Sequence, residues 1–211
     1  MNTNSPLETL TEIRSMMERS TRFISLNGLA GVFAGVFALI GAGAAYYYLK
    51  LKLFEPSEYN YLHSGVRNSE MDFYTFFFTD ALLVLFASLT VAVFLSVRKA
   101  RKKGLKVWDN MAKRVTVNMM VPLASGGFFC LVMLYHGFIG LIAPATLLFY
   151  GLALFNTSKY TYSDIRILGL LEIMLGLLSS IWLGYGLLFW AFGFGVLHIV
   201  YGIILYIKYE R

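Results

Sequence analysis

Glu172 and His198 are the two residues best placed to do chemistry, because each is an ionisable side chain within a long apolar stretch. Small residues at helical spacing surround both of them: Gly169, Gly176 and Ser180 around Glu172, and Ala191, Gly195 and Gly202 around His198. Small residues let helices approach closely, and an unpaired charge at a membrane-helix centre costs about 2.5–3.5 kcal/mol. We therefore expect the two side chains to meet in an antiparallel hairpin. They would form either a proton- or ligand-binding centre or a structural hydrogen bond that orients the helices.

Three further polar residues lie within or beside apolar stretches. Asp80 would lie near the outer membrane surface, as a third polar site for protons or ligands or as a capped, partly hydrated carboxylate. Asn27 and Asn118 both fall near the expected inner boundary, where their amides predict a hydrogen bond between two helices.

The usual signatures of catalysis and cofactor binding are missing from the sequence. It contains no HExxH, CxxC or GxxxxGK[ST] motif and no acidic metal-ligand run. The three histidines are far apart, and we expect neither a metal site nor a cofactor. The sequence therefore favours a non-enzymatic protein.

The composition explains where these polar residues must lie. The chain of 211 residues is 58% hydrophobic and only 14% charged, whereas soluble domains are about 25% charged. Stretches of about 20 apolar residues are long enough to cross a bilayer as helices. Six segments approach or exceed that length, and they lie near residues 23–49, 72–97, 115–136, 138–155, 165–183 and 187–207. We predict an all-α fold, a six-span transmembrane bundle over residues 23–207.

The distribution of Lys and Arg predicts the orientation of this bundle. Of the 18 Lys and Arg residues, only Lys50, Lys52 and Arg67 would lie outside if the N-terminus is inside. Positive residues concentrate on the cytoplasmic side of membrane proteins. The sequence thus predicts a multi-pass protein of the cytoplasmic membrane with both termini inside.

Residues 98–114 form a strongly basic loop between the second and third predicted spans. Its first part contains Arg98, Lys99, Arg101, Lys102, Lys103 and Lys106. We interpret it as a cytoplasmic surface for membrane lipids or a cytoplasmic partner, although it would equally serve to set the topology. The net charge of +6 needs no nucleic-acid partner, because topology already accounts for it.

The first 22 residues have a pattern that predicts an amphipathic helix. Ser5-Pro6-Leu7-Glu8 has the pattern of a capping box, and apolar residues follow at helical spacing. We expect an amphipathic helix on the inner leaflet or on the protein's own cytoplasmic face. In the first span, Gly31 and Gly35 form a GxxxG motif, which predicts close helix contact within the bundle or in a homo-oligomer.

Residues 14–35, above all the stretch ERS-x-RFISL at 18–26, resemble a family of bacterial six-span integral membrane proteins with no assigned activity. The similarity continues through residues 72–89 and the glycine-rich fifth and sixth spans. The resemblance implies a bacterial inner-membrane location. It also suggests a sensing role through a neighbouring winged-helix regulator.

Two functions follow from these expectations. One is a non-enzymatic membrane module that senses or scaffolds, using its basic cytoplasmic surface. The other is a small transporter or channel subunit in which Glu172, His198 and Asp80 are intramembrane polar sites.

Overall fold

The structure is a computed structural model that describes residues 27–48, 69–104 and 107–211, with the side chains of 69–73 excluded. Every regular element in these ranges is helical. The elements are α2 (Gly28–Tyr48), α3 (Ser69–Lys102), α4 (Asn110–Tyr135), η2 (Ile139–Leu141), α5 (Ile142–Thr157), η3 (Ser158–Tyr160), α6 (Asp164–Ile181), η4 (Leu183–Tyr185), α7 (Gly186–Trp190), η5 (Ala191–Leu197) and α8 (His198–Tyr209). The predicted amphipathic segment 1–22 and Lys106 lie outside the described residues.

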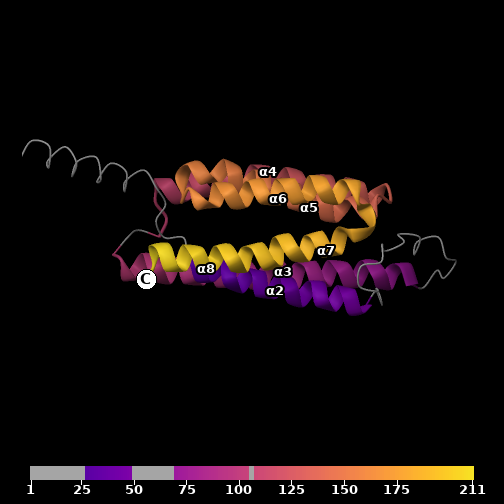
Figure 1. The fold of residues 1–211 in the computed structure, drawn as a ribbon, viewed down its shortest axis with the longest axis horizontal. Coiled ribbons are helices and arrows are strands. Elements are labelled where there is room, and N and C mark those ends of the chain that lie inside the picture. Colours follow the sequence, from indigo (N-terminus) through magenta and orange to yellow (C-terminus); the bar gives the residue numbers. More distant parts are fainter. Residues whose placement is uncertain (1–26, 49–68, 105–106) are drawn as a thin grey trace, which may run out of the picture.

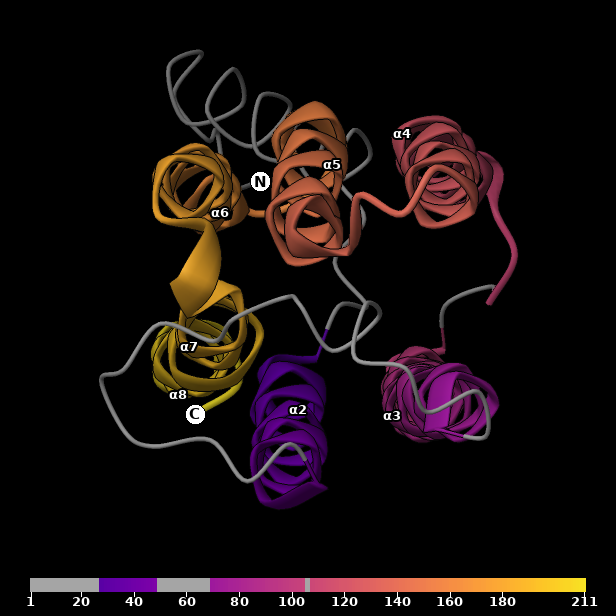
Figure 2. The same cartoon turned by 90° about the vertical axis from the view of Figure 1, so that its right-hand side faces the viewer.

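The helices run side by side in two layers (Figure 1). One layer contains α4, α5 and α6, with α5 in the middle. The other contains α3, α2 and the α7–η5–α8 helix, with α2 in the middle (Figure 2). The chain passes between the layers where α6 leads into α7, and there α5 and α6 contact α7 and η5. Glu172 of α6 and His198 of α8, described below, contact each other between the two layers.

Among the described residues, five helices are long and apolar enough to cross a membrane: 28–48, 74–102, 110–135, 139–160 and 183–209. Their outward faces carry large apolar residues, such as Leu83 and Phe86 at 65% and 61% exposure. Apolar surface on this scale needs a nonaqueous environment or a partner. The expectation of an all-helical chain with long membrane-type helices is thus confirmed for the described residues. Helix α6 has only 18 residues and includes Asp164, Arg166 and Glu172, so it lacks the long stretch with at most two charged residues that each of these five helices has.

The observed end of α3 differs from the sequence expectation in an informative way. Helix α3 continues to Lys102, so the first part of the basic segment is helical rather than loop. Lys, Arg and Ala are good helix formers, and basic residues suit a helix C-terminus. The chain turns only at Gly104, whose φ of 64° is the left-handed conformation that glycine adopts easily. Pro144 lies in the first turn of α5, where a backbone N–H has no partner within the helix, so its missing N–H removes no helical hydrogen bond.

Glycines set the spacing between neighbouring helices within this single chain. A Cβ on Gly202 of α8 would lie 2.6 Å from the backbone nitrogen of Val32 in α2. A Cβ on Gly35, the second glycine of the GxxxG motif, would lie 2.6 Å from the carbonyl oxygen of Gly195. Of the two uses expected for this motif, the structure therefore contains the one within the bundle.

Candidate functional site

The carboxyl group of Glu172 lies at the junction between the two layers. Glu172 is on the buried face of α6 and is 0% exposed. It fits there because the residue opposite is a glycine: a Cβ on Gly193 of η5 would lie 2.5 Å from Oε2 of Glu172. A larger residue at position 193 would displace the carboxylate.

His198 begins α8 and connects Glu172 to α5. Its Nδ1 lies 3.4 Å from Oε1 of Glu172 and 3.0 Å from the carbonyl oxygen of Gly193. Its Nε2 lies 2.8 Å from the hydroxyl oxygen of Tyr150. A carbonyl oxygen only accepts, so Nδ1 carries a proton and donates it to Gly193. In a neutral ring, Nε2 then accepts from Tyr150.

Tyr150 is the member of this group that sequence analysis missed. Its ring also packs against Phe194, with the ring centroids 4.9 Å apart. A tyrosine in the middle of an apolar span, away from the interfacial aromatic belts, was the available signal. The group Glu172–His198–Tyr150, hereafter the buried triad, joins α6, α8 and α5.

A π-helical segment determines which residues face the triad. Element η5, residues 191–197, has π-helical geometry, and Gly193 and His198 are joined by a side-chain hydrogen bond across five residues. The sequence analysis assumed α-helical spacing for Ala191, Gly195, His198 and Gly202 and so placed Gly195 on the same helix face as His198. In the structure Gly195 instead packs against Leu39 of α2, while Gly193 faces Glu172. That prediction was wrong because a π-turn shifts the register.

The small-residue stripe on α6 also needs one correction. A Cβ on Gly169 or on Gly176 would collide with the backbone of α5, which agrees with the predicted close contact. Ser180 is exposed and donates to the carbonyl of Leu177, whereas the neighbouring Ser179 is 0% exposed. The buried face therefore continues through Ser179.

Hydrogen bonding around the triad is incomplete among the described residues. Both carboxylate oxygens of Glu172 and the hydroxyl of Ser179 are buried without a hydrogen-bond partner. The 3.4 Å contact with His198 is a close approach rather than a directed bond, since Nδ1 points to Gly193. An ionised carboxylate here would lack the donors that normally offset its desolvation.

Asp80 is not part of this group. It lies on α3 and faces α2, where a Cβ on Gly41 would be 3.2 Å from its Oδ2. His136 is exposed at the end of α4. The structure thus brings Glu172 and His198 together and leaves Asp80 on α3, which α2 separates from the α7–η5–α8 helix (Figure 2).

The two asparagines have different partners from those expected. Oδ1 of Asn27 accepts from the backbone nitrogen of Leu29 and so caps the start of α2. The side chain of Asn118 donates to the carbonyl of Arg114 and accepts from the side chain of Asn156 in α5. The predicted bond between Asn27 and Asn118 was wrong because the two belong to different layers. Asn118 does link two helices, but through Asn156.

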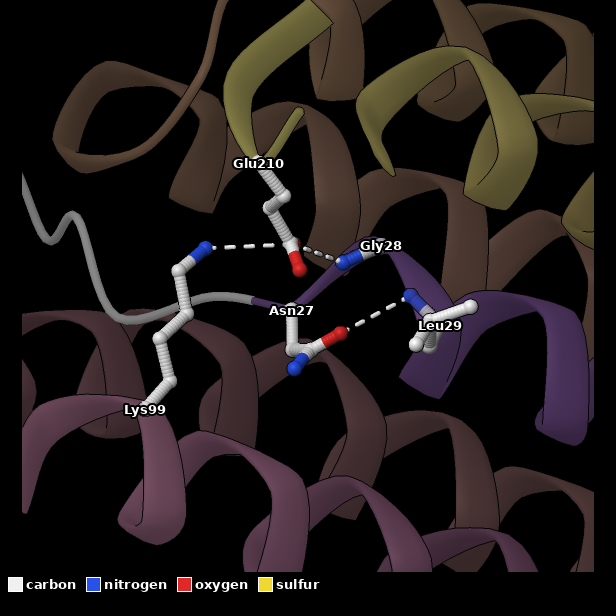
Figure 3. Close-up of polar contacts among 5 residues, drawn as sticks. All are labelled: Asn27, Gly28, Leu29, Lys99 and Glu210. Atoms are coloured by element: carbon white, nitrogen blue, oxygen red, sulfur yellow. Dashed lines mark hydrogen bonds and ion pairs between the residues drawn. The ribbon is translucent and has the colours of Figure 1, made fainter. Parts of the chain in front are cut away.

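A second polar cluster lies at the end of the bundle where α2 begins and α3 and α8 end (Figure 3). Oε1 of Glu210 accepts from Nζ of Lys99 at 3.1 Å and from the backbone nitrogen of Gly28 at 2.6 Å. These contacts join three helix ends that are distant in sequence. Sequence analysis assigned no role to Glu210, and no local pattern pointed to one.

The basic residues predicted as a lipid or partner surface lie beside this cluster. Arg98, Arg101, Lys102 and Lys103 are exposed, while Lys99 is 9% exposed beneath them. A cleft of about 430 Å³ is lined by Arg98, Lys99, Lys102, Lys103, Asn27 and Glu210, among others. We refer to it as the basic cleft.

A third cluster joins the start of α6 to the end of α8. Asp164 accepts from Nζ of Lys208 at 3.0 Å and from the hydroxyl of Tyr209 at 2.7 Å. Burial alone would raise the pKa of Asp164, but these hydrogen bonds outweigh it and hold the pKa below its usual value. Nearby, burial and the Glu210 carboxylate raise the pKa of Tyr162 to about 12.

The chemistry open to these sites is limited. Within the described residues, no group of three His, Cys, Asp or Glu side chains could hold a metal ion. The triad combines an acid, an imidazole and a phenol, which are proton-exchanging groups, but its carboxylate is sealed from the surface. Comparison with protein-family models, curated proteins and solved structures gives no match for this chain.

Proposed function

We propose that this chain is a six-span bacterial inner-membrane protein with both termini in the cytoplasm. Helix α6, the fifth span in chain order, would add a sixth span to the five long apolar helices, and it packs along α5 in the same layer as α4 (Figure 1). Its 18 residues correspond to about 27 Å of helix, close to the bilayer core. Lys and Arg then gather at the end that holds the basic cleft. The bacterial assignment rests on the resemblance of residues 14–35.

Reporter fusions test this topology directly. Fusions to a cytoplasmic fluorescent protein and to a periplasmic phosphatase, placed after residues 104, 161 and 211, should all report the cytoplasm. A fusion at Gly137 or Gly184 should report the periplasm. A terminus on the other side would refute the even span count.

The proposed function is non-enzymatic: the protein senses or scaffolds at the cytoplasmic face of the membrane, with lipids or a cytoplasmic regulator as partners. The observation that carries this proposal is the tight packing of the triad. Glu172 is 0% exposed and His198 6% exposed, and Gly193 closes over the carboxylate. A packed contact of this kind supports orientation of the helices more than passage of a substrate.

The experiment is a pull-down with the full chain and with the chain lacking residues 1–22. A cytoplasmic partner should be retained by the full chain and lost on deletion. Retention by both proteins would remove the N-terminal segment from the proposal.

A small transporter or channel subunit is the second candidate, and one observation favours it. Among the described residues, the oxygens of Glu172 and the hydroxyl of Ser179 lack hydrogen-bond partners, and Glu172 faces Gly193 of the π-helical η5. Such segments are frequent at functional sites. Proton flux into proteoliposomes should then fall in Glu172→Gln and His198→Ala but persist in Ser180→Ala, which changes an exposed neighbour. Equal flux in all four proteins would discard this candidate.

A further inference from the structure

The basic cleft has the charge and the neighbouring surface of a lipid-binding site. Four basic side chains and one acidic side chain line it. The acid, Glu210, is already engaged by Lys99 and by the backbone nitrogen of Gly28. The lining is therefore net positive, and the exposed Arg98, Lys102 and Lys103 form its outer wall.

An apolar groove begins where the cleft ends. It has a volume of about 820 Å³ and is lined on α3 by Leu89, Thr90, Val93, Phe94 and Val97. Arg98 and Lys102 line both the cleft and the groove. From Leu89 to Lys102 the helix rises about 20 Å, which is comparable to one leaflet of the hydrocarbon core, about 15 Å.

We propose that the cleft and groove together bind one anionic glycerophospholipid of the cytoplasmic leaflet. The phosphate would lie against Arg98, Lys102 and Lys103, and an acyl chain would follow α3 past Val97, Val93 and Leu89. Arginine pairs well with phosphate oxygens because of its planar fork of donors. Glu210 is a positioning residue: it holds Lys99 and the start of α2 in place and contributes the floor of the cleft.

This inference rests on the proposed function because it names the lipid class for the cytoplasmic surface. It goes further because it assigns lipid binding to the residues of the basic cleft and not to the other basic residues at the same end of the bundle. Lys113 and Arg114 are also exposed, at the start of α4, but they line neither cavity. They provide a control with the same change in charge.

The test is native mass spectrometry of the full chain in detergent, titrated with dioleoylphosphatidylglycerol and, separately, with dioleoylphosphatidylcholine. The wild type should bind one phosphatidylglycerol in preference to phosphatidylcholine. Arg98→Gln with Lys102→Gln should weaken that affinity about tenfold, whereas Lys113→Gln with Arg114→Gln should leave it unchanged. Equal weakening in both variants, or equal binding of the two lipids, would overturn the site.

A competition experiment separates a lipid from a free anion. Inorganic phosphate at millimolar concentration should not displace the bound phosphatidylglycerol, and Val93→Trp in the groove should weaken the lipid. Complete displacement by phosphate, with no effect of Val93→Trp, would show that the groove takes no acyl chain. The pull-down and the fusion reporters are separate readouts, so failure of the proposed function and failure of this site are distinguishable.

Discussion

The buried triad and the basic cleft both combine a glutamate with a basic side chain, but the two glutamates have opposite surroundings. Glu172 is fully enclosed, and neither of its oxygens has a hydrogen-bond partner among the described residues. Glu210 lies at a helix end and accepts from both Lys99 and Gly28. A partner close by does not by itself satisfy a carboxylate, because donor direction and solvent access also matter. We therefore expect stability to depend mainly on side-chain size and packing at the triad, and mainly on charge at the cleft.

The largest effect should come from Gly193→Leu. A Cβ at this position would lie 2.5 Å from Oε2 of Glu172, so the substitution should destabilise the bundle by about 3 kcal/mol. Thermal unfolding in detergent measures this. Gly43→Leu is the matched control, because a Cβ there meets nothing within 4 Å. Equal melting temperatures for the two variants would mean that the triad is loosely packed.

His198→Ala should cost about 2–3 kcal/mol. The change removes a buried ring and leaves the hydroxyl of Tyr150 without its partner. The double variant with Tyr150→Phe should recover part of the loss, since no buried hydroxyl then lacks a bond. Strict additivity of the two changes in unfolding free energy would contradict the predicted coupling.

Glu210→Gln should destabilise the cleft end by about 1 kcal/mol, because it removes a partly buried ion pair but keeps an acceptor for Gly28. The effect should shrink when unfolding is measured in 1 M salt, as screening weakens the wild-type pair. A loss that is independent of salt would assign the stabilisation to the backbone contact instead.

Glu172→Gln is the most direct test of the difference between the two glutamates, although its expected effect on stability is small. Because neither oxygen accepts a hydrogen bond from the part of the chain that the structure describes, the amide should change the free energy of unfolding by less than about 1 kcal/mol in either direction. Chemical denaturation of wild type and variant measures the difference. A loss above about 3 kcal/mol would instead indicate a fully ionised pair with His198.

The smallest effect concerns pH at the third cluster. The folded pKa of Asp164 is held below its unfolded value, so the carboxylate stabilises the fold fully above that unfolded value. The contribution should be lost as pH falls from about 4 through the lower folded pKa. Melting temperatures across this range should fall more steeply for wild type than for Asp164→Asn. Parallel profiles would exclude this source of acid sensitivity.

Much of the fold was predictable because helix formation and hydropathy depend on nearby residues. The apolar segments predicted near 115–136 and 165–183 correspond to α4 (Asn110–Tyr135) and α6 (Asp164–Ile181). The contact between Glu172 and His198 also followed from two ionisable residues on adjacent predicted helices. The register of the last helix did not follow, since a π-helical segment is stabilised by tertiary packing and leaves no distinct local pattern.

Two kinds of information therefore determine this molecule. The sequence by itself determined that the chain is helical and apolar, and that its cations gather in a few segments. Tertiary structure alone decided that Gly193 rather than Gly195 faces Glu172, that Tyr150 completes the triad, and that Glu210 pairs with Lys99, 111 positions away in the sequence. Periodicity reports which face of a helix is apolar, but the partner of a buried polar atom depends on how distant helices pack.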